Sequence, residues 1–230
     1  MIIIFLSEFF SQIVYVALFG IHHSLKLVKK GAEGDIYFAE FDDSPAILKT
    51  RKTKPYRHHI LDGRIRKQRT IREASILCEA KSFGVHTPLV YQVNANDCTI
   101  LMQKIDGVLV KNLNGAKLRS ACVEIGKITA TLHKNGIVHG DLTTSNFIAK
   151  NNTIYAIDFG LAQKSIKIED HAVDLRLYKE ILGSAHVEVM DVLWNAFLKG
   201  YKSVVGVGRF NKILHQLGII EGRGRYARME

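Results

Sequence analysis

The chain has 230 residues, of which 47% are hydrophobic and 23% charged. These values are ordinary for a globular protein and exclude a disordered chain, collagen and a coiled coil. With 32 Lys and Arg against 22 Asp and Glu, the net charge is +10, so we expect a polyanionic partner such as nucleic acid, a nucleotide or an acidic protein. Three isolated cysteines (Cys78, Cys98 and Cys122) exclude a disulfide framework and a zinc knuckle and favour a reducing compartment.

The first residues of the chain are strongly apolar and approach the ~20 residues of a membrane span. However, Glu8 and Gln12 lie in the middle of this segment, and a central acidic group costs about 2.5–3.5 kcal/mol on insertion. The segment also lacks the basic start and the cleavage site of a signal peptide. We therefore expect a hydrophobic extension over residues 1–22, either packed on the domain or lying upstream of the true start, and no membrane partner.

The first part of the chain has the pattern of a sheet protein. Two short strands are predicted within residues 25–41 around a glycine turn, and a third strand at 46–49. Next, Asp62 is predicted to cap a helix that runs to residue 83. Strands are then predicted at residues 87–93 and 98–105.

The later part of the chain has helical periodicity. A long apolar stripe over residues 118–136 predicts a helix, and two more helices are predicted at 169–182 and 187–199. Between them, residues 147–157 predict a hairpin around the turn Asn151-Asn152. We therefore predict an α+β, two-lobed fold with a β-rich N-lobe and a helical C-lobe. The predicted boundaries are an N-lobe over residues 23–104, a C-lobe over 105–220 and a basic tail over 221–230.

The strongest chemical signal is the octet of residues 139–146, His-Gly-Asp-Leu-Thr-Thr-Ser-Asn, followed by Asp158-Phe159-Gly160. Phosphoryl transfer needs a carboxylate near the attacking hydroxyl and oxygen ligands that hold Mg²⁺ on the phosphates. Asp141 supplies the first, as catalytic base, and Asn146 and Asp158 supply the second, as metal ligands. Each fragment alone is weak, but both at this spacing, with a hairpin between them, indicate a kinase-type site.

Candidates for ATP binding lie upstream of this octet. Lys49 ends a predicted strand, where it would reach the phosphates, and Glu73 lies on the following helix, where it would pair with Lys49. The glycine turn lacks the complete pattern of a phosphate-binding loop, and by itself it is a hairpin turn. Residues 102–105 occupy the position of the segment that meets adenine. The full set of candidates is Gly31, Ala32, Glu33, Gly34, Lys49, Glu73, Met102 and Lys104.

Several segments resemble one family closely. They are Lys30-Gly-Ala-Glu33, the stretch over residues 54–62, Arg72-Glu-Ala74, the octet of residues 139–146, Asp158-Phe-Gly-Leu-Ala162 and Ala172-Val-Asp-Leu175. The resemblance is to the atypical serine/threonine kinase and ATPase subunit of the KEOPS complex, the PRPK-like family. It implies a small two-lobed kinase fold that uses ATP and Mg²⁺. It also implies tRNA and a tRNA-modifying catalytic subunit as partners, in the synthesis of N6-threonylcarbamoyladenosine.

The resemblance also implies roles for particular residues. Lys49 and Glu73 correspond to the ion pair of the family, Asp141 to the base, and Asn146 and Asp158 to the metal ligands. Asp174 resembles the helix aspartate that braces the catalytic loop, although a helix-capping role is open as well.

The sequence departs from typical protein kinases at three places. Gly140 replaces an arginine, Thr143 replaces a lysine of the catalytic loop, and residues 160–170 are too few for an activation segment. These departures favour an ATPase or a constitutive phosphotransferase over a regulated protein kinase. They leave the phosphate acceptor open.

Positive charge is concentrated in two segments. Residues 49–72 carry ten Lys and Arg against one acid, Asp62. The tail carries Arg223 and Arg225, which resemble the family's arginine-rich end and are predicted to contact tRNA, whereas the alternative is a frayed terminus.

Two other functions remain as alternatives, a small-molecule kinase of the aminoglycoside or choline type and a non-catalytic RNA-binding scaffold. The chain after Asp158 is short and basic, which argues against a small-molecule kinase. The site residues Lys49, Asp141, Asn146 and Asp158 are all present, which argues against a non-catalytic scaffold. We expect the protein in the cytoplasm, with the nucleus as a further compartment.

Overall fold

A computed structural model describes residues 25–31 and 34–226, with side chains up to residue 223. The predicted extension over residues 1–22 lies outside the described residues, as do Ala32 and Glu33. No helix in the described part of the chain combines the length and apolar character that a membrane crossing requires.

The described chain divides into two compact units. The first, strand-rich unit contains residues 25–74 and 89–104, and the second, helical unit contains residues 75–88 and 105–226. The sequence placed one boundary near residue 104, whereas the contacts assign residues 75–88 to the helical unit. The reason is that α2 (His59–Ser82) is a single helix whose last turns pack with the second unit.

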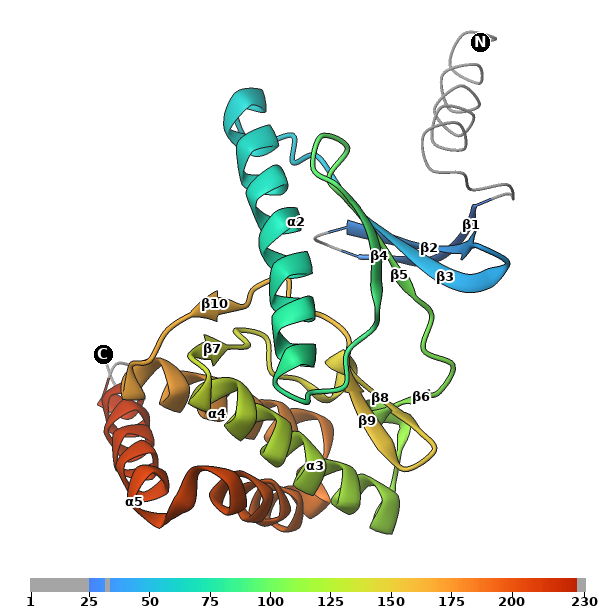
Figure 1. The fold of residues 1–230 in the computed structure, drawn as a ribbon. Coiled ribbons are helices and arrows are strands. Elements are labelled where there is room, and N and C mark those ends of the chain that lie inside the picture. The colour runs from blue at the N-terminus through green and yellow to red at the C-terminus, as the bar shows by residue number, and fades with distance from the viewer. Residues whose placement is uncertain (1–24, 32–33, 227–230) are drawn as a thin grey trace, which may run out of the picture. The chain divides into compact units, whose positions relative to one another are not determined.

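The strand-rich unit is built on one antiparallel sheet (Figure 1). Its order is β1-β2-β3-β5-β4, so the five strands predicted in the first part of the chain all lie in this sheet. Their bounds are β1 Lys26–Lys30, β2 Gly34–Phe41, β3 Ser44–Arg51, β4 Val90–Asn94 and β5 Thr99–Gln103. Ala46, Leu48 and Leu101 form the buried centre of the sheet.

Helix α2 begins earlier than predicted, and Asp62 is not its N-cap. Asp62 lies in the first turn of the helix and accepts a hydrogen bond from Arg66 Nε (2.7 Å) one turn later. Arg57 Nη1 approaches its other oxygen at 3.6 Å. Because the helix already begins at His59, Asp62 lies inside its first turn and not at the N-cap position that the sequence predicted.

Three helices form most of the helical unit (Figure 1). They are α3 Gly115–Lys134, α4 Ile168–Ala185 and α5 Met190–Tyr226. The predicted stripe of α3 is buried, with Leu118, Ile125 and Leu132 at most 3% exposed. The last helix continues far beyond residue 199, with non-helical backbone at Gly206 (φ 78°), so the described part of the predicted tail is the end of a helix.

Short elements complete this unit. They are β6 Val108–Leu109, η1 Val110–Asn112, β7 Ile137–Val138, η2 Thr144–Asn146, β8 Phe147–Lys150, β9 Thr153–Ala156, β10 Gln163–Lys164 and η3 Val187–Val189. The predicted hairpin is β8 and β9, and both turn residues, Asn151 and Asn152, have positive φ (48° and 62°). Such values suit asparagine in a tight hairpin turn.

Helices α3 and α5 approach each other through glycines. A Cβ added at Gly126 would lie 2.1 Å from the Phe197 carbonyl oxygen, and one added at Gly200 would lie 1.9 Å from that of Val123. Real Cβ atoms do not approach backbone this closely, so both positions require glycine.

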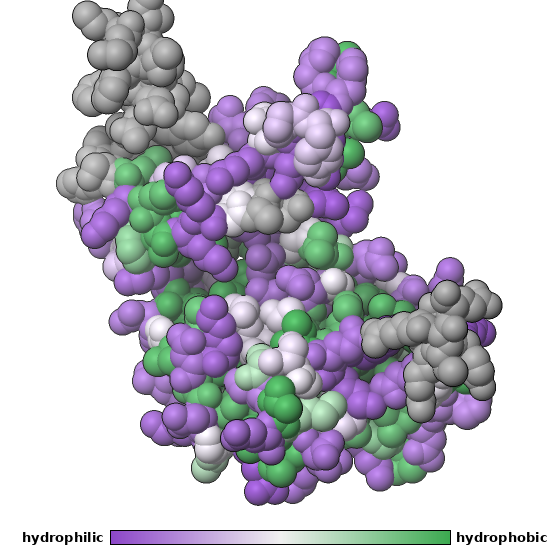
Figure 2. Space-filling model, turned by 180° about the vertical axis from the view of Figure 1, so that it is seen from behind, coloured by the Kyte–Doolittle hydropathy of each residue, from purple (hydrophilic) through white to green (hydrophobic). Residues whose placement is uncertain are grey.

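The surface of the described residues is mainly hydrophilic on the face shown in Figure 2, with apolar side chains interspersed.

Candidate active site

The octet of residues 139–146 forms a loop between β7 and β8. At its start, Gly140 has φ 75°, and a Cβ there would lie 2.5 Å from the Leu161 carbonyl oxygen. The loop therefore packs directly against the backbone that follows Asp158-Phe159-Gly160. This contact explains why glycine, and not a larger residue, occupies position 140.

The hairpin brings the predicted catalytic and metal-binding residues together. Asn146 Nδ2 donates hydrogen bonds to both Oδ2 and the carbonyl oxygen of Asp141, each at 2.8 Å. The backbone N–H of Ile157 donates to the Asn146 carbonyl oxygen (3.0 Å), which places Asp158 beside Asn146 in the fold. Asp158 Oδ1 in turn accepts the backbone N–H of Gly160 (2.9 Å). Asp141, Asn146 and Asp158 thus form one cluster of oxygen-bearing side chains.

This cluster fits Mg²⁺ by its chemistry. Because Asn146 uses its amide nitrogen toward Asp141, its amide oxygen is left for a cation. Mg²⁺ prefers oxygen ligands and usually keeps water and phosphate oxygens beside one or two carboxylates. In the described part of the chain no group of three or more His, Cys, Asp or Glu could form an all-protein metal cage. The donor set therefore suits a metal that arrives with a nucleotide.

A buried aspartate on α4 holds the start of the loop. The backbone N–H groups of His139 and Gly140 donate to Asp174 Oδ2 (2.6 Å) and Oδ1 (2.8 Å). His133 Nε2 lies 3.1 Å from Asp174 Oδ2, and Tyr201 Oη lies 2.8 Å from His133 Nδ1. The brace suggested by the resemblance is therefore present, and capping is not the role of this side chain. No motif or spacing in the sequence pointed to His133 or Tyr201.

Burial and hydrogen bonding set the ionisation of this brace. Burial by itself raises the pKa of Asp174, but the hydrogen bond and charge of His133 and the His139 amide outweigh burial, so the pKa lies below its ordinary value. Asp174 is therefore ionised and can only accept hydrogen bonds. Burial lowers the pKa of His139, with partial compensation by Asp174, Asp158 and Asp141. The His139 ring is consequently neutral and packs beside Phe159, with ring centroids 5.0 Å apart.

The strand-rich unit contains the predicted ion pair. Lys49 Nζ lies 2.6 Å from Glu73 Oε1, and the Glu73 side chain is fully buried. Arg51, two residues along β3, donates to the other oxygen of Glu73. The sequence missed Arg51, because alternation along a strand places residues 49 and 51 on the same face but does not show which helix residue lies opposite.

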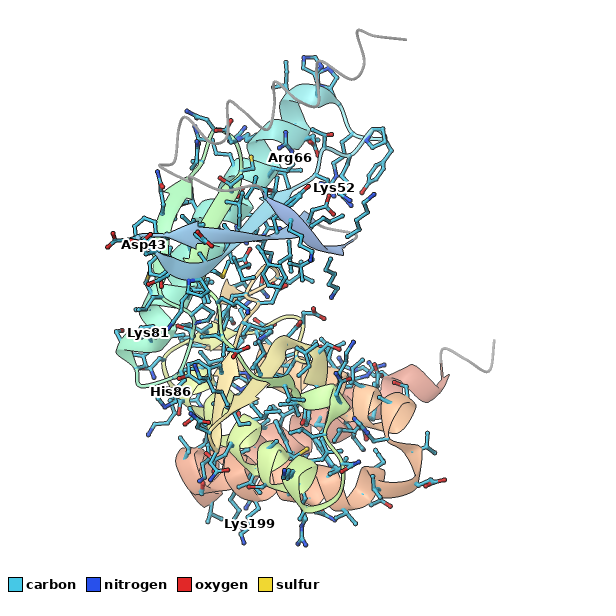
Figure 3. All side chains as sticks on the ribbon, turned by 90° about the vertical axis from the view of Figure 1, so that its right-hand side faces the viewer. Asp43, Lys52, Arg66, Lys81, His86 and Lys199 are labelled. Carbon is cyan, nitrogen blue, oxygen red and sulfur yellow. The ribbon has the colours of Figure 1, made fainter. Side chains whose placement is uncertain are left out.

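Other lysines and arginines of the segment 49–72 are paired within the unit. Lys52 binds Asp35 (2.7 Å) and Arg66 binds Asp62 (2.7 Å); both cations are labelled in Figure 3. The charge counted from the sequence therefore overstates the positive charge that this segment presents to a partner.

The remaining predicted ATP-binding residues have individual environments. Gly31 and Gly34 close the β1–β2 turn, where the Gly31 N–H donates to the Gly34 carbonyl oxygen (2.9 Å). Met102 is buried in β5. The Lys104 N–H donates to the Pro45 carbonyl oxygen (3.2 Å), and its Nζ lies 5.1 Å from the centroid of the Phe38 ring. The Lys104 amide is therefore engaged inside the sheet.

The predicted tRNA-contacting arginines lie at the end of α5. The Arg223 side chain is 72% exposed, with its Nη1 3.9 Å from Glu169 Oε1. Arg225 lies on the helix, but its side chain is outside the described part of the structure. Because this ion pair is long and exposed to solvent, it is weak, and the positive charge of Arg223 remains available to a partner.

Comparisons with known proteins agree with this geometry. The RIO domain matches residues 35–178, more than half of the chain. KEOPS complex subunit Bud32 of Pyrococcus abyssi is 42% identical over 88% of this chain and 96% of its own length. The chain therefore belongs to the Bud32 branch of the RIO domain family. This membership confirms the family suggested by the motifs.

Other relatives of this Bud32-type chain are longer proteins. A protein of Methanocaldococcus jannaschii, named a probable bifunctional tRNA threonylcarbamoyladenosine biosynthesis protein, is 44% identical over 87% of this chain. The chain spans only 37% of that relative.

Solved structures confirm the predicted α+β kinase-like fold. The Rio2 kinase of Chaetomium thermophilum, solved with ADP, Mg²⁺ and phosphoaspartate, has a TM-score of 0.64 at 14% identity and covers 93% of this chain and 74% of its own. WaaP, solved with acyl carrier protein, has a TM-score of 0.57 at 16% identity and covers 94% and 92%.

Proposed function

We propose that this chain binds ATP with Mg²⁺ and hydrolyses or transfers the γ-phosphate as the Bud32-type subunit of a KEOPS complex. The complex would act in the synthesis of threonylcarbamoyladenosine on tRNA. The names of the relatives support the assembly and the pathway. The arrangement of Asp141, Asn146 and Asp158 supports the chemistry.

The observation that carries the proposal is the hydrogen bond from Asn146 to Asp141. It holds the Asp141 carboxylate in one orientation through Oδ2. A carboxylate held in this way can accept the proton of an attacking water or hydroxyl. When bound, Mg²⁺ would neutralise charge on the phosphates, with Asn146 and Asp158 as its protein ligands.

Lys49 has the environment of a phosphate-binding lysine. Glu73 holds its ammonium group at the end of a stiff strand, and the lysine side chain is 11% exposed. We propose that it binds phosphate oxygens of the nucleotide, as a pre-positioned cation that loses little conformational entropy on binding.

Water is the acceptor that the loops support best. The segment after Gly160 reaches α4 at Ile168 within eight residues and has only a two-residue strand, β10, on the way. It therefore lacks the length of a platform for a peptide. We propose ATP hydrolysis as the basal reaction and leave serine or threonine phosphorylation to the assembled complex.

The test compares Asp141→Asn with Asp191→Asn. Asp191 lies exposed in the first turn of α5, so its substitution makes the same charge change in the same unit. We expect Asp141→Asn to lower the rate of Mg²⁺-dependent ATP hydrolysis by about 10²–10⁴-fold, with ATP affinity within a few-fold of wild type. Asp191→Asn should retain the wild-type rate.

A single-turnover assay separates the rate of the chemical step from the affinity for ATP. If Asp141→Asn lost ATP affinity but kept its rate on bound ATP, Asp141 would be a binding residue and the mechanism would be wrong. A third variant, Asp158→Asn, should raise the Mg²⁺ concentration needed for half-maximal rate. An unchanged Mg²⁺ dependence would remove Asp158 from the metal site.

For the tRNA part of the proposal, the double variant Arg223→Gln/Arg225→Gln should weaken tRNA binding by the assembled complex. Each lost phosphate contact lowers the slope of log K against log salt by about 0.7–0.9, so two contacts lower it by about 1.5. The control is Lys117→Gln/Arg119→Gln, which removes two exposed charges from α3. Equal slopes for the two double variants would show that the end of α5 does not contact tRNA.

A further inference from the structure

A second hydrogen-bonded group lies beside the brace, around His171 of α4. The His171 ring is fully buried and stacks on His133, with centroids 4.2 Å apart and planes at 9°. Arg209 Nη2 of α5 lies 3.2 Å from His171 Nδ1, and His171 Nε2 lies 3.1 Å from the Ser165 carbonyl oxygen. Arg209 Nη2 also donates to the His133 carbonyl oxygen (3.2 Å), at the end of α3.

These contacts allow His171 only one protonation state. A guanidinium group has only donors, so Nδ1 facing Arg209 must accept and carries no proton. A carbonyl oxygen has only acceptors, so Nε2 facing Ser165 must carry the proton. A second proton on Nδ1 would set two donors against each other. His171 is therefore neutral, in the Nε2–H form.

Ser165 connects this group to both catalytic loops. Its N–H donates to the Gly136 carbonyl oxygen (2.9 Å), just before β7. The strand before it, β10, pairs with β7 in the register Gln163 to Val138 and Lys164 to Ile137. One strand of this ladder leads into the Asp141 loop and the other leads away from Asp158. Fixing Ser165 therefore fixes the two segments relative to each other.

We propose that Arg209 is a positioning residue for the reaction. A charged His171 ring would keep its Nε2–H, but its Nδ1–H would point at the Arg209 guanidinium, so the buried ring and the Ser165 carbonyl bound to it would have to shift. By keeping the ring neutral and in place, Arg209 keeps the Asp141 loop aligned with the segment that follows Asp158. The kinetic part of this inference rests on the proposed ATP-dependent activity. The structural part does not.

The surroundings of His171 give the direction of its titration. The charged and titratable groups that face it are His133 from α3, Asp174 on its own helix and Arg209 from α5, with Tyr201 behind His133. Burial is the main cause of its low pKa of about 4, and the charges of His133 and Arg209 lower it further, against the Ser165 hydrogen bond and Asp174. Removing the guanidinium group should therefore let His171 bind a proton at a higher pH.

The first test is proton NMR of the histidine rings between pH 7.5 and 4.5, with the His171 signal identified by its absence in His171→Gln. In the wild type we expect no titration midpoint in this range. In Arg209→Met the midpoint should rise by about one unit or more. Lys212→Met, which removes an exposed cation from the same helix, should behave as the wild type. A wild-type midpoint near 6.5 would overturn the proposal, whether or not any variant folds.

The second test is the pH dependence of ATP hydrolysis, as the ratio of variant to wild type. Arg209→Met should lose rate at acid pH, with a midpoint equal to that of His171 by NMR. The double variant Arg209→Met/His171→Gln should lack this acid limb, because glutamine cannot be protonated there. A uniform loss at every pH in both variants would mean that Arg209 only packs, and would refute its positioning role. If the wild type hydrolysed no ATP, the proposed function would fail and the NMR result would still decide this inference.

Discussion

Replacing Asp174 by asparagine tests the brace that holds the loop of residues 139–146. The carboxylate accepts hydrogen bonds from three donors, namely the buried amide of His139, the part-buried amide of Gly140 and the buried Nε2–H of His133. Asparagine has nearly the same shape but offers one oxygen and adds an NH₂ group. At least one buried donor then faces another donor, and the bonds that remain lose the assistance of a charge.

The expected cost follows from these contacts. A buried donor without an acceptor costs about 1–3 kcal/mol, and hydrogen bonds to a charged group contribute about 1.5–3 kcal/mol each. We therefore expect Asp174→Asn to lower the free energy of unfolding by about 2–4 kcal/mol. For a chain of this size that corresponds to a fall in Tm of about 6–12 °C.

Thermal unfolding followed by circular dichroism measures this change, and hydrogen exchange locates it. The amides of His139 and Gly140 should exchange faster in the variant. The control is Glu180→Gln on the same helix, where an exposed pair with Arg176 (2.8 Å) contributes less than about 0.5 kcal/mol. If Asp174→Asn and the control shifted Tm equally, with unchanged exchange at residues 139 and 140, Asp174 would not brace the loop.

Three further outcomes are expected. Gly126→Ala should destabilise the protein by about 2–3 kcal/mol in urea unfolding, because its Cβ would meet the backbone of α5, whereas Gly183→Ala, with nothing within 4 Å, should be neutral or slightly stabilising. The low pKa of His171, about 4 against 6.5 when unfolded, means that the unfolded chain binds the proton first. Stability should therefore fall by up to about 3 kcal/mol as the pH falls from 6.5 to 4, and less in His171→Gln, by urea unfolding at several pH values. Glu73→Gln should lower the free energy of unfolding by about 3–5 kcal/mol in the same assay, because Lys49 and Arg51 lose their carboxylate partner. The control Asp43→Asn, in an exposed turn, should change it little. Equal effects of the two substitutions would refute the role of the ion pair.

Short-range sequence patterns predicted how the residues of the candidate active site come together. The distance from Asp141 to Asn146 is five residues, and a four-residue strand, a turn with two asparagines and a second strand of four residues lead to Asp158. Each step is local, so strand alternation and turn chemistry were enough to bring the three side chains together. The same holds for Lys49 at the end of β3 and for the buried stripe of α3.

Tertiary contacts decided what holds that part in place. The bonds from the loop to Asp174 span 34 and 35 residues, and the contact between His133 and Tyr201 spans 68. No spacing rule connects such positions, because the partner is set by which helix faces align when the unit packs. The cap predicted at Asp62 failed for a local reason, because the helix begins three residues earlier, at His59, and Asp62 pairs with arginines of its own helix and of the preceding loop.

The glycines show both cases, a role that the local sequence predicts and a role that only tertiary packing creates. The turn at Gly31 and Gly34 could be read from the sequence, because glycine between two strands marks a tight turn. The need for glycine at positions 126 and 200 could not, because it arises only where α3 and α5 bring their backbones into contact. Local conformation depends on neighbouring residues in the sequence, whereas a close approach between two helices arises only when they pack against each other.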